Sequence, residues 1–289
     1  MAGPLAAYLL AQRPARRDVA TGAVVGVAAC LLLAGPGDTF VALERGWIAL
    51  LAGALTVLMM LRPGRAFVPT ALTALGLAAA AAALVVAATP LSFDEVAWRV
   101  TQHFGYQARQ VLGAMAEAAE RTGGEAPGVV TALERSVGTG IRIASGVFPA
   151  LLLLQSLAAL ALAWGLYRRL AREPVGEPVG ALREFRFDDN LVWGIVLALG
   201  ALLVPGPVGL GALGANLAVF FGGLYAVRGV AVASALAAAA GIRGWGAVLG
   251  GSVVVLFLAP VAALAALALG VTDTWVDWRA RLARSAGAR

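Results

Sequence analysis

The sequence predicts an all-α fold, a polytopic bundle of transmembrane helices, and three observations support this. Hydrophobic residues make up 61% of the chain and charged residues only 13%, whereas a soluble domain carries roughly 25% charged residues. Several uncharged runs reach the roughly 20 residues that a helix needs to cross a bilayer. Tryptophans gather near the ends of these runs, as in the aromatic belts at membrane interfaces; they are Trp47, Trp164, Trp193, Trp245, Trp275 and Trp278.

Seven apolar segments are predicted to span the membrane. They cover about 19–35, 46–61, 66–89, 144–167, 191–209, 212–242 and 246–270. Three arginines precede the first run, and no cleavage site follows it, so we expect a retained anchor rather than a signal peptide. The positive-inside rule places the N-terminus in the cytoplasm.

The predicted organisation has four parts. Residues 1–89 hold the N-terminal membrane segments, and 90–143 form an extracytoplasmic hairpin. Residues 144–270 hold the C-terminal membrane segments with a cytoplasmic loop at 168–190, and 271–289 form a basic interfacial tail.

The hairpin is predicted to consist of two amphipathic helices on the outer surface. Ser92 and Glu95 form a capping box at the start of the first helix, and Gly123-Gly124 end it. The second helix begins near Pro127. The first helix carries an apolar stripe at helical spacing: Val96, Val100, Phe104, Val111 and Met115. This stripe packs within the chain or docks a partner.

The tail conflicts with the count of seven spans. Seven spans from a cytoplasmic start leave the tail outside, yet VTDTWVDWRARLAR is typical of a cytoplasmic interfacial helix. In such a helix Trp275, Trp278 and Leu282 share one side, and Asp277 pairs with Arg281. A turn at Arg228-Gly229 would give eight spans and return the tail to the cytoplasm. We favour a single tilted helix over 212–242, because no proline or polar cluster forces a break there.

The cytoplasmic loop contains EPVGEPVG, which indicates a solvated linker. It ends at Asp188, Asp189 and Asn190. Adjacent carboxylates could hold Mg²⁺, but a helix N-cap is the favoured interpretation.

Sequence motifs for catalysis are absent. The chain has no HExxH, P-loop, GxSxG or CxxC motif, one histidine (His103) and one cysteine (Cys30). No carboxylate lies inside the predicted spans, although a proton- or Na⁺-coupled carrier normally has one. The basic residues lie in short loops beside apolar runs, which indicates membrane topology rather than nucleic-acid binding. We therefore expect neither an enzyme nor a driven transporter, with no catalytic residue, metal or cofactor.

Four polar residues remain inside the predicted spans and form a tentative ligand site: Gln155, Asn216, Tyr225 and Arg228. An arginine at membrane depth is costly, and its usual interpretation is functional. Arg228 could hold an anionic small molecule, or hydrogen-bond the amide oxygen of Gln155 or Asn216 or helix C-terminal carbonyls. Alternatively it marks the cytoplasmic turn of the eight-span topology.

Residues of about 145–284 resemble a known family. VFPALLLLQSLAALALAWGLYRRLAR, FRFDDNLVWGIVLALGALLV, ANLAVFFGGLYAVRGVAVAS and GVTDTWVDWRARL resemble the C-terminal half of the YybS-like family, uncharacterised multi-pass proteins of the bacterial cytoplasmic membrane. The sharpest elements are Arg228-Gly229 and a closing motif of Gly270, Asp273, Trp278 and Arg279. The family is distantly like the substrate-binding subunits of energy-coupling-factor importers.

Two functions follow as hypotheses. In the first, the chain is a small-molecule-binding or transport-associated membrane subunit with its ligand near Arg228. In the second, it is a structural or scaffold subunit that presents the 91–143 hairpin to a partner protein. The resemblance favours the first.

Overall fold

The computed structural model of the protein describes residues 39–62, 64–88, 93–121, 127–171, 174, 176–204, 208–242 and 245–287. Within these ranges the chain is helical, with turns and no strand, which confirms the predicted all-α class. The first predicted span, 19–35, with Cys30, lies outside the described residues.

An N-terminal core is formed by three apolar helices, α3 (Thr39–Leu61), α4 (Phe67–Ala88) and α7 (Phe148–Leu170). Trp47 donates a buried hydrogen bond to Ser156 Oγ at 2.9 Å and so joins α3 to α7. Small side chains let these helices approach closely, as in membrane bundles; Ala52, Ala71, Ala74, Ala78, Ala159 and Ala163 are all buried.

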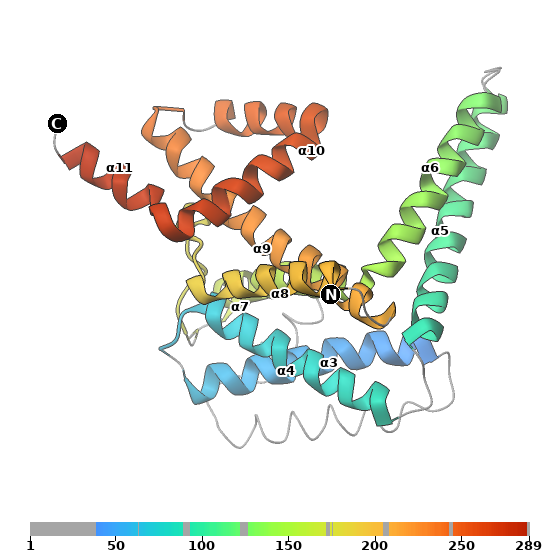
Figure 1. The fold of residues 1–289 in the computed structure, drawn as a ribbon, viewed down its shortest axis with the longest axis horizontal. Helices are drawn as coiled ribbons and strands as arrows, with labels where there is room; N and C mark the ends of the chain where they lie inside the picture. Colours follow the sequence, from blue (N-terminus) through green and yellow to red (C-terminus); the bar gives the residue numbers. More distant parts are fainter. Residues whose placement is uncertain are drawn as a thin grey trace.

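The hairpin consists of α5 (Phe93–Arg121) and α6 (Pro127–Gly146), which pack against each other and project from the rest of the chain (Figure 1). The helical pair is therefore confirmed, while its Gly123-Gly124 connection lies outside the described residues. Val100 is buried, but Phe104, Val111 and Met115 are 40%, 60% and 52% exposed. Most of the predicted stripe is therefore not covered within the chain.

The segment between α7 and α8 is mostly exposed, and its start is held against α7. It contains two short 3₁₀ helices, η1 (Leu182–Glu184) and η2 (Asp189–Leu191). The indole of Trp164 donates to the Glu177 carbonyl at 2.9 Å, and Arg168 donates to the Gly176 carbonyl. These bonds hold Gly176 and Glu177 against the end of α7, while residues 177–184 are exposed, as expected of a solvated linker.

Two predicted span boundaries need correction. α8 (Val192–Leu203) has 12 residues and is about 18 Å long, whereas the prediction gave a span over 191–209. Within the described residues, four stretches are long and apolar enough to cross a membrane: Phe67–Val85, Phe148–Leu170, Leu210–Ala239 and Ala259–Val276. The last stretch contains Asp273. The expectation that no carboxylate lies inside a span is therefore wrong.

α9 (Val208–Ala239) is one continuous helix through Arg228 and Gly229. The single helix that we favoured is confirmed, and the alternative turn at these residues is wrong. The chain reverses instead in α10 (Trp245–Val276), which contains Pro260. Proline removes a helical hydrogen bond and clashes with the preceding turn, and Figure 1 shows that α10 bends sharply into two arms.

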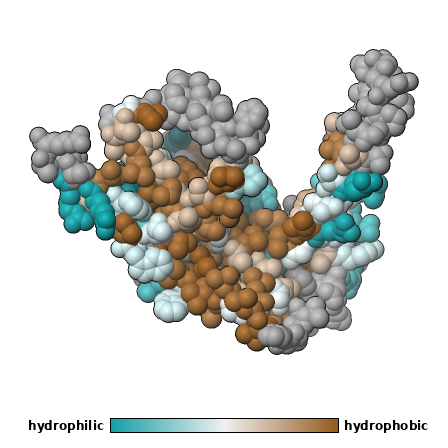
Figure 2. Space-filling view, turned by 45° about the horizontal axis from the view of Figure 1, so that its top comes forward, coloured by the Kyte–Doolittle hydropathy of each residue, from teal (hydrophilic) through white to brown (hydrophobic). Residues whose placement is uncertain are grey.

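The tail is not one interfacial helix. α10 continues to Val276, Asp277 adopts a positive φ of 42°, and α11 (Trp278–Gly287) starts in a new direction. Trp275 is 70% exposed on α10, so it does not share a helix face with Trp278. Figure 2 shows apolar side chains over the central helices and hydrophilic ones on α11 and on the hairpin.

Candidate functional site

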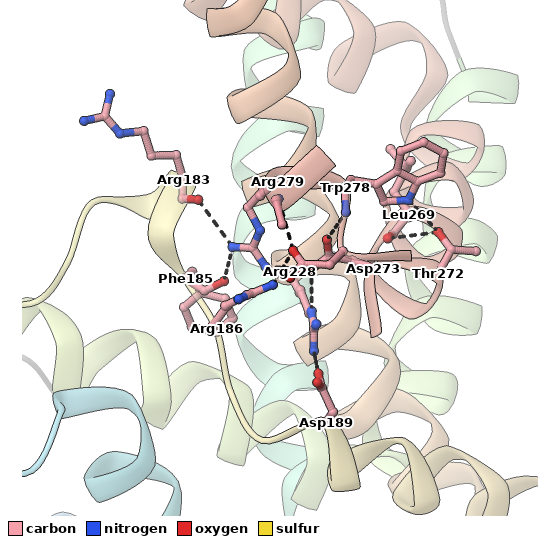
Figure 3. A network of polar contacts seen from close by, with 12 residues as sticks. Arg183, Phe185, Arg186, Asp189, Arg228, Leu269, Thr272, Asp273, Trp278 and Arg279 are labelled. Atoms are coloured by element: carbon pink, nitrogen blue, oxygen red, sulfur yellow. Dashed lines mark hydrogen bonds and ion pairs between the residues drawn. The ribbon is translucent and has the colours of Figure 1, made fainter. Parts of the chain in front are cut away.

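Arg228 is the centre of a buried ion-pair network. Its side chain is 1% exposed, yet it meets two carboxylates from different elements. Its Nε donates to Asp273 Oδ2 at 3.0 Å, and a terminal nitrogen donates to Asp189 Oδ1 at 2.6 Å (Figure 3). Asp273 on α10 is fully buried, whereas Asp189 of η2 is 60% exposed.

Asp273 has further donors. A terminal nitrogen of Arg279 donates to Asp273 Oδ2 at 2.6 Å, and the backbone N–H of Trp278 donates to Oδ1 at 3.2 Å. The network therefore joins two guanidinium groups to two carboxylates. A buried charge is tolerated only when it is paired and hydrogen-bonded, and this arrangement supplies both conditions.

Two glycines allow α9 and α10 to approach closely enough for this pairing. A Cβ on Gly229 would lie 1.7 Å from the Ala266 carbonyl oxygen, and one on Gly270 would lie 1.8 Å from the Tyr225 carbonyl oxygen. Both distances are far inside atomic contact, so no larger residue fits at either position. The structure thus explains why glycine follows Arg228 and why Gly270 precedes Asp273 by one helical turn.

Aromatic rings cover the network on the side of the α7–α8 segment. The guanidinium carbon of Arg228 lies 5.4 Å from the centroid of the Phe187 ring, a cation–π distance. Phe187 in turn meets Tyr225 edge-to-face at 5.0 Å. These rings exclude water from Arg228 and strengthen its ion pairs.

An outer layer of contacts ties the tail to the α7–α8 segment. Arg279 donates to the carbonyls of Phe185 at 3.0 Å and Arg183 at 3.4 Å, and Arg186 pairs with Asp277 at 2.5 Å. The Arg186 hydrogen bond lowers the pKa of Asp277, and the same bond raises the pKa of Arg186. Asp277 thus pairs with Arg186, and the predicted pairing with Arg281 is wrong.

These contacts bear on the side of the protein on which the tail lies. The tail and the α7–α8 segment touch, so they lie on the same face of the protein. A seven-span topology would separate them across a membrane, so the number of spans stays a prediction. The reversal in α10 returns the tail to that face, without a turn at Arg228.

The four candidate ligand residues do not form one site. Tyr225 and Arg228 both pack against Phe187, but the other two lie elsewhere. Gln155 is exposed on α7. Asn216 Oδ1 accepts from the Ala150 N–H at 3.1 Å, while its Nδ2 donates to the carbonyls of Gly146 at 3.1 Å and Ala212 at 2.9 Å. Asn216 therefore anchors the α6–α7 junction to α9. It lies 12 residues from Arg228, about 18 Å along the helix.

The carboxylate partners of Arg228 were missed in the sequence. Asp188 accepts from the Asn190 N–H at 2.9 Å and caps η2, which confirms the predicted cap, but Asp189 pairs with Arg228 instead. Asp273 was assigned to the tail. The available signal was charge: Asp189 and Asp273 are acidic residues close to the ends of the segments on either side of α9.

A groove lies beside the network, between α8 and α9. It has a volume of about 450 Å³, within the range of ligand-binding pockets. Its walls are mostly apolar and its polar groups come from Asp188 and Asn190 in the segment before α8; the other lining residues are Leu191, Trp193, Gly194, Leu197, Leu217 and Phe221.

Helices that are long and apolar enough to cross a membrane indicate a membrane protein of the α-helical class. The chain belongs to the family described as predicted membrane protein and designated DUF2232, which matches residues 2–274. This confirms the expectation of a membrane protein family of unknown function, while the narrower YybS-like assignment stays a prediction. No curated protein and no solved structure matches the chain.

Proposed function

We propose that the protein is a multi-pass membrane subunit that binds a small amphipathic molecule in the groove between α8 and α9. The groove carries this proposal because it combines an apolar wall with polar groups at one end. Such a cavity suits a ligand with an apolar chain and a polar head.

Arg228 is a poorer ligand site than the groove. Its Nε and one terminal nitrogen already bond Asp273 and Asp189, and its charge is balanced by theirs. An anionic ligand would have to displace a carboxylate from a buried pair. We therefore assign Arg228 to structure, and Asn216 and Gln155 have no part in the proposed site.

The proposed orientation puts the α7–α8 segment and α11 in the cytoplasm. Both carry exposed arginines, including Arg183, Arg186 and Arg284, and cytoplasmic loops are enriched in Arg and Lys. The hairpin then lies outside the cytoplasm. The distant likeness to importer subunits supports a transport-associated role in a bacterial cytoplasmic membrane, with energy from a partner.

Blocking the groove tests this function. Leu217→Trp adds an indole inside the groove, whereas Leu199→Trp adds one to α8 at an exposed position outside it. Native mass spectrometry should detect fewer bound amphipathic molecules on Leu217→Trp and an unchanged number on Leu199→Trp. Equal occupancy of both variants and the parent would refute binding in the groove.

A scaffold role is the second candidate, and the exposed stripe on α5 favours it. Phe104, Val111 and Met115 would each be covered by a partner that docks on the hairpin. Deleting about 95–140 should then release a partner that co-purifies with the full chain. Retention of every partner by the deletion variant would exclude this role.

A further inference from the structure

The polar end of the groove carries a negative charge that no described residue balances with an ion pair. Asp188 is exposed and lines the groove. Its carboxylate caps η2, and among the described residues it makes no ion pair. A capping bond leaves the net charge of the carboxylate unchanged, so Asp188 places a negative charge at the edge of a mostly apolar groove.

The arginines near the groove form ion pairs with other carboxylates. Arg186 pairs with Asp277, and Arg228 pairs with Asp189 and Asp273. None of these arginines lines the groove. An anionic head group at the groove would therefore meet Asp188 without a compensating cation, which is unfavourable.

An aromatic side chain lines the same groove as Asp188. Trp193 lines the same groove and is 63% exposed. An ammonium group gains from both a carboxylate and an indole face, while Leu197, Leu217 and Phe221 supply an apolar wall for a hydrocarbon chain. The charge and the aromatic surface favour the same head-group chemistry.

We propose that the groove binds a membrane lipid whose head group ends in an ammonium, with the ammonium at Asp188 and Trp193 and an acyl chain along Leu197, Leu217 and Phe221. This inference rests on the proposed function and names its ligand class. It replaces the anionic small molecule expected from Arg228.

The test is a competition between two lipids with identical acyl chains, phosphatidylethanolamine and phosphatidylglycerol, on the full-length protein. Native mass spectrometry after delipidation and re-addition should show that the parent retains phosphatidylethanolamine about two- to fivefold better, the range that an exposed ion pair supplies. A preference for phosphatidylglycerol, or no preference, would overturn the proposal.

Asp188→Asn removes the charge and keeps an equally good cap. It should abolish the preference, whereas Glu184→Gln, which removes an exposed charge of the same segment outside the groove, should keep it. If Asp188→Asn lowers the thermal midpoint, Asp188→Ser supplies a second cap without charge. Persistence of the preference in the stable variant would contradict the role of Asp188.

Leu217→Trp distinguishes a failure of the head-group assignment from a failure of the proposed function. Loss of both lipids in Leu217→Trp, with an unchanged preference in Asp188→Asn, would leave groove binding intact and refute the head-group assignment. No change in either variant would refute both.

Discussion

At the scale of single residues, Arg228 has the clearest role. It lies inside an apolar helix, yet two carboxylates and an aromatic ring surround its guanidinium. Its planar guanidinium donates hydrogen bonds to carboxylates on two different elements at once. The ammonium of a lysine reproduces this geometry poorly. Removing Arg228 would leave the fully buried Asp273 with Arg279 as its one cationic partner among the described residues.

Arg228→Leu should therefore lower the free energy of unfolding by about 3–5 kcal/mol, the usual cost of breaking a buried ion pair. Reversible unfolding in detergent measures this. Arg281→Leu, which removes an exposed arginine of α11, is the control and should change stability by less than about 0.5 kcal/mol. A ligand-clamp role would instead leave the stability of Arg228→Leu at the level of this control.

The Arg186–Asp277 pair predicts a pH dependence. Because the folded-state pKa of Asp277 is lowered, its stabilisation is present above the unfolded pKa, about 3.9, and is lost as pH falls through the folded pKa. Both side chains are about half exposed, so the effect is at most about 1 kcal/mol.

Asp277→Asn should remove part of the acid-induced fall in thermal midpoint below about pH 4, while asparagine still tolerates the positive φ. The measurement is the thermal midpoint between pH 3 and 6. Parallel curves for the parent and Asp277→Asn would show that the pair contributes nothing.

At the scale of elements, the crossing of α9 and α10 depends on backbone proximity. Gly229 and Gly270 each face a carbonyl of the other helix. This contact sets Arg228 and Asp273 within hydrogen-bonding distance. Helix packing and ion pairing are therefore one feature of the fold rather than two.

Gly270→Ala should push the helices apart and destabilise the protein by about 1–3 kcal/mol, as overpacked cores do. Gly222→Ala, on α9 with open space around its Cα, should be neutral or slightly stabilising because alanine favours helix. Thermal unfolding compares the two. Equal midpoints would contradict the close crossing.

The helices were largely predictable from the sequence, and the site was not. Apolar runs of sufficient length predicted the all-α class and the continuity of α9, and amphipathic spacing predicted the hairpin. The last predicted span ends at 270, before Asp273, because a carboxylate lowers the mean hydropathy of its segment. It does so even when an arginine on another helix balances its charge. The partners of Arg228 are 39 and 45 residues away, and such pairing follows from helix packing rather than local pattern.

At the scale of the whole molecule, the network joins the α7–α8 segment to the C-terminal tail on one face. Pro260 lies in the helix that reverses the chain, and Asp277 turns it again into α11. The arginines of both segments then lie on one face of the protein, as the proposed orientation under the positive-inside rule requires. The hairpin projects from the other end of the α7 helix (Figure 1).

Cysteine accessibility tests this arrangement most directly. In a Cys30→Ser background, Ala181→Cys in the α7–α8 segment, Ala286→Cys in α11 and Gly138→Cys in the hairpin are probed with a membrane-impermeant thiol reagent. In intact cells, position 138 should react, while 181 and 286 should react only after permeabilisation. Labelling of 286 from outside, with 181 protected, would contradict the shared face and with it the Arg228 network.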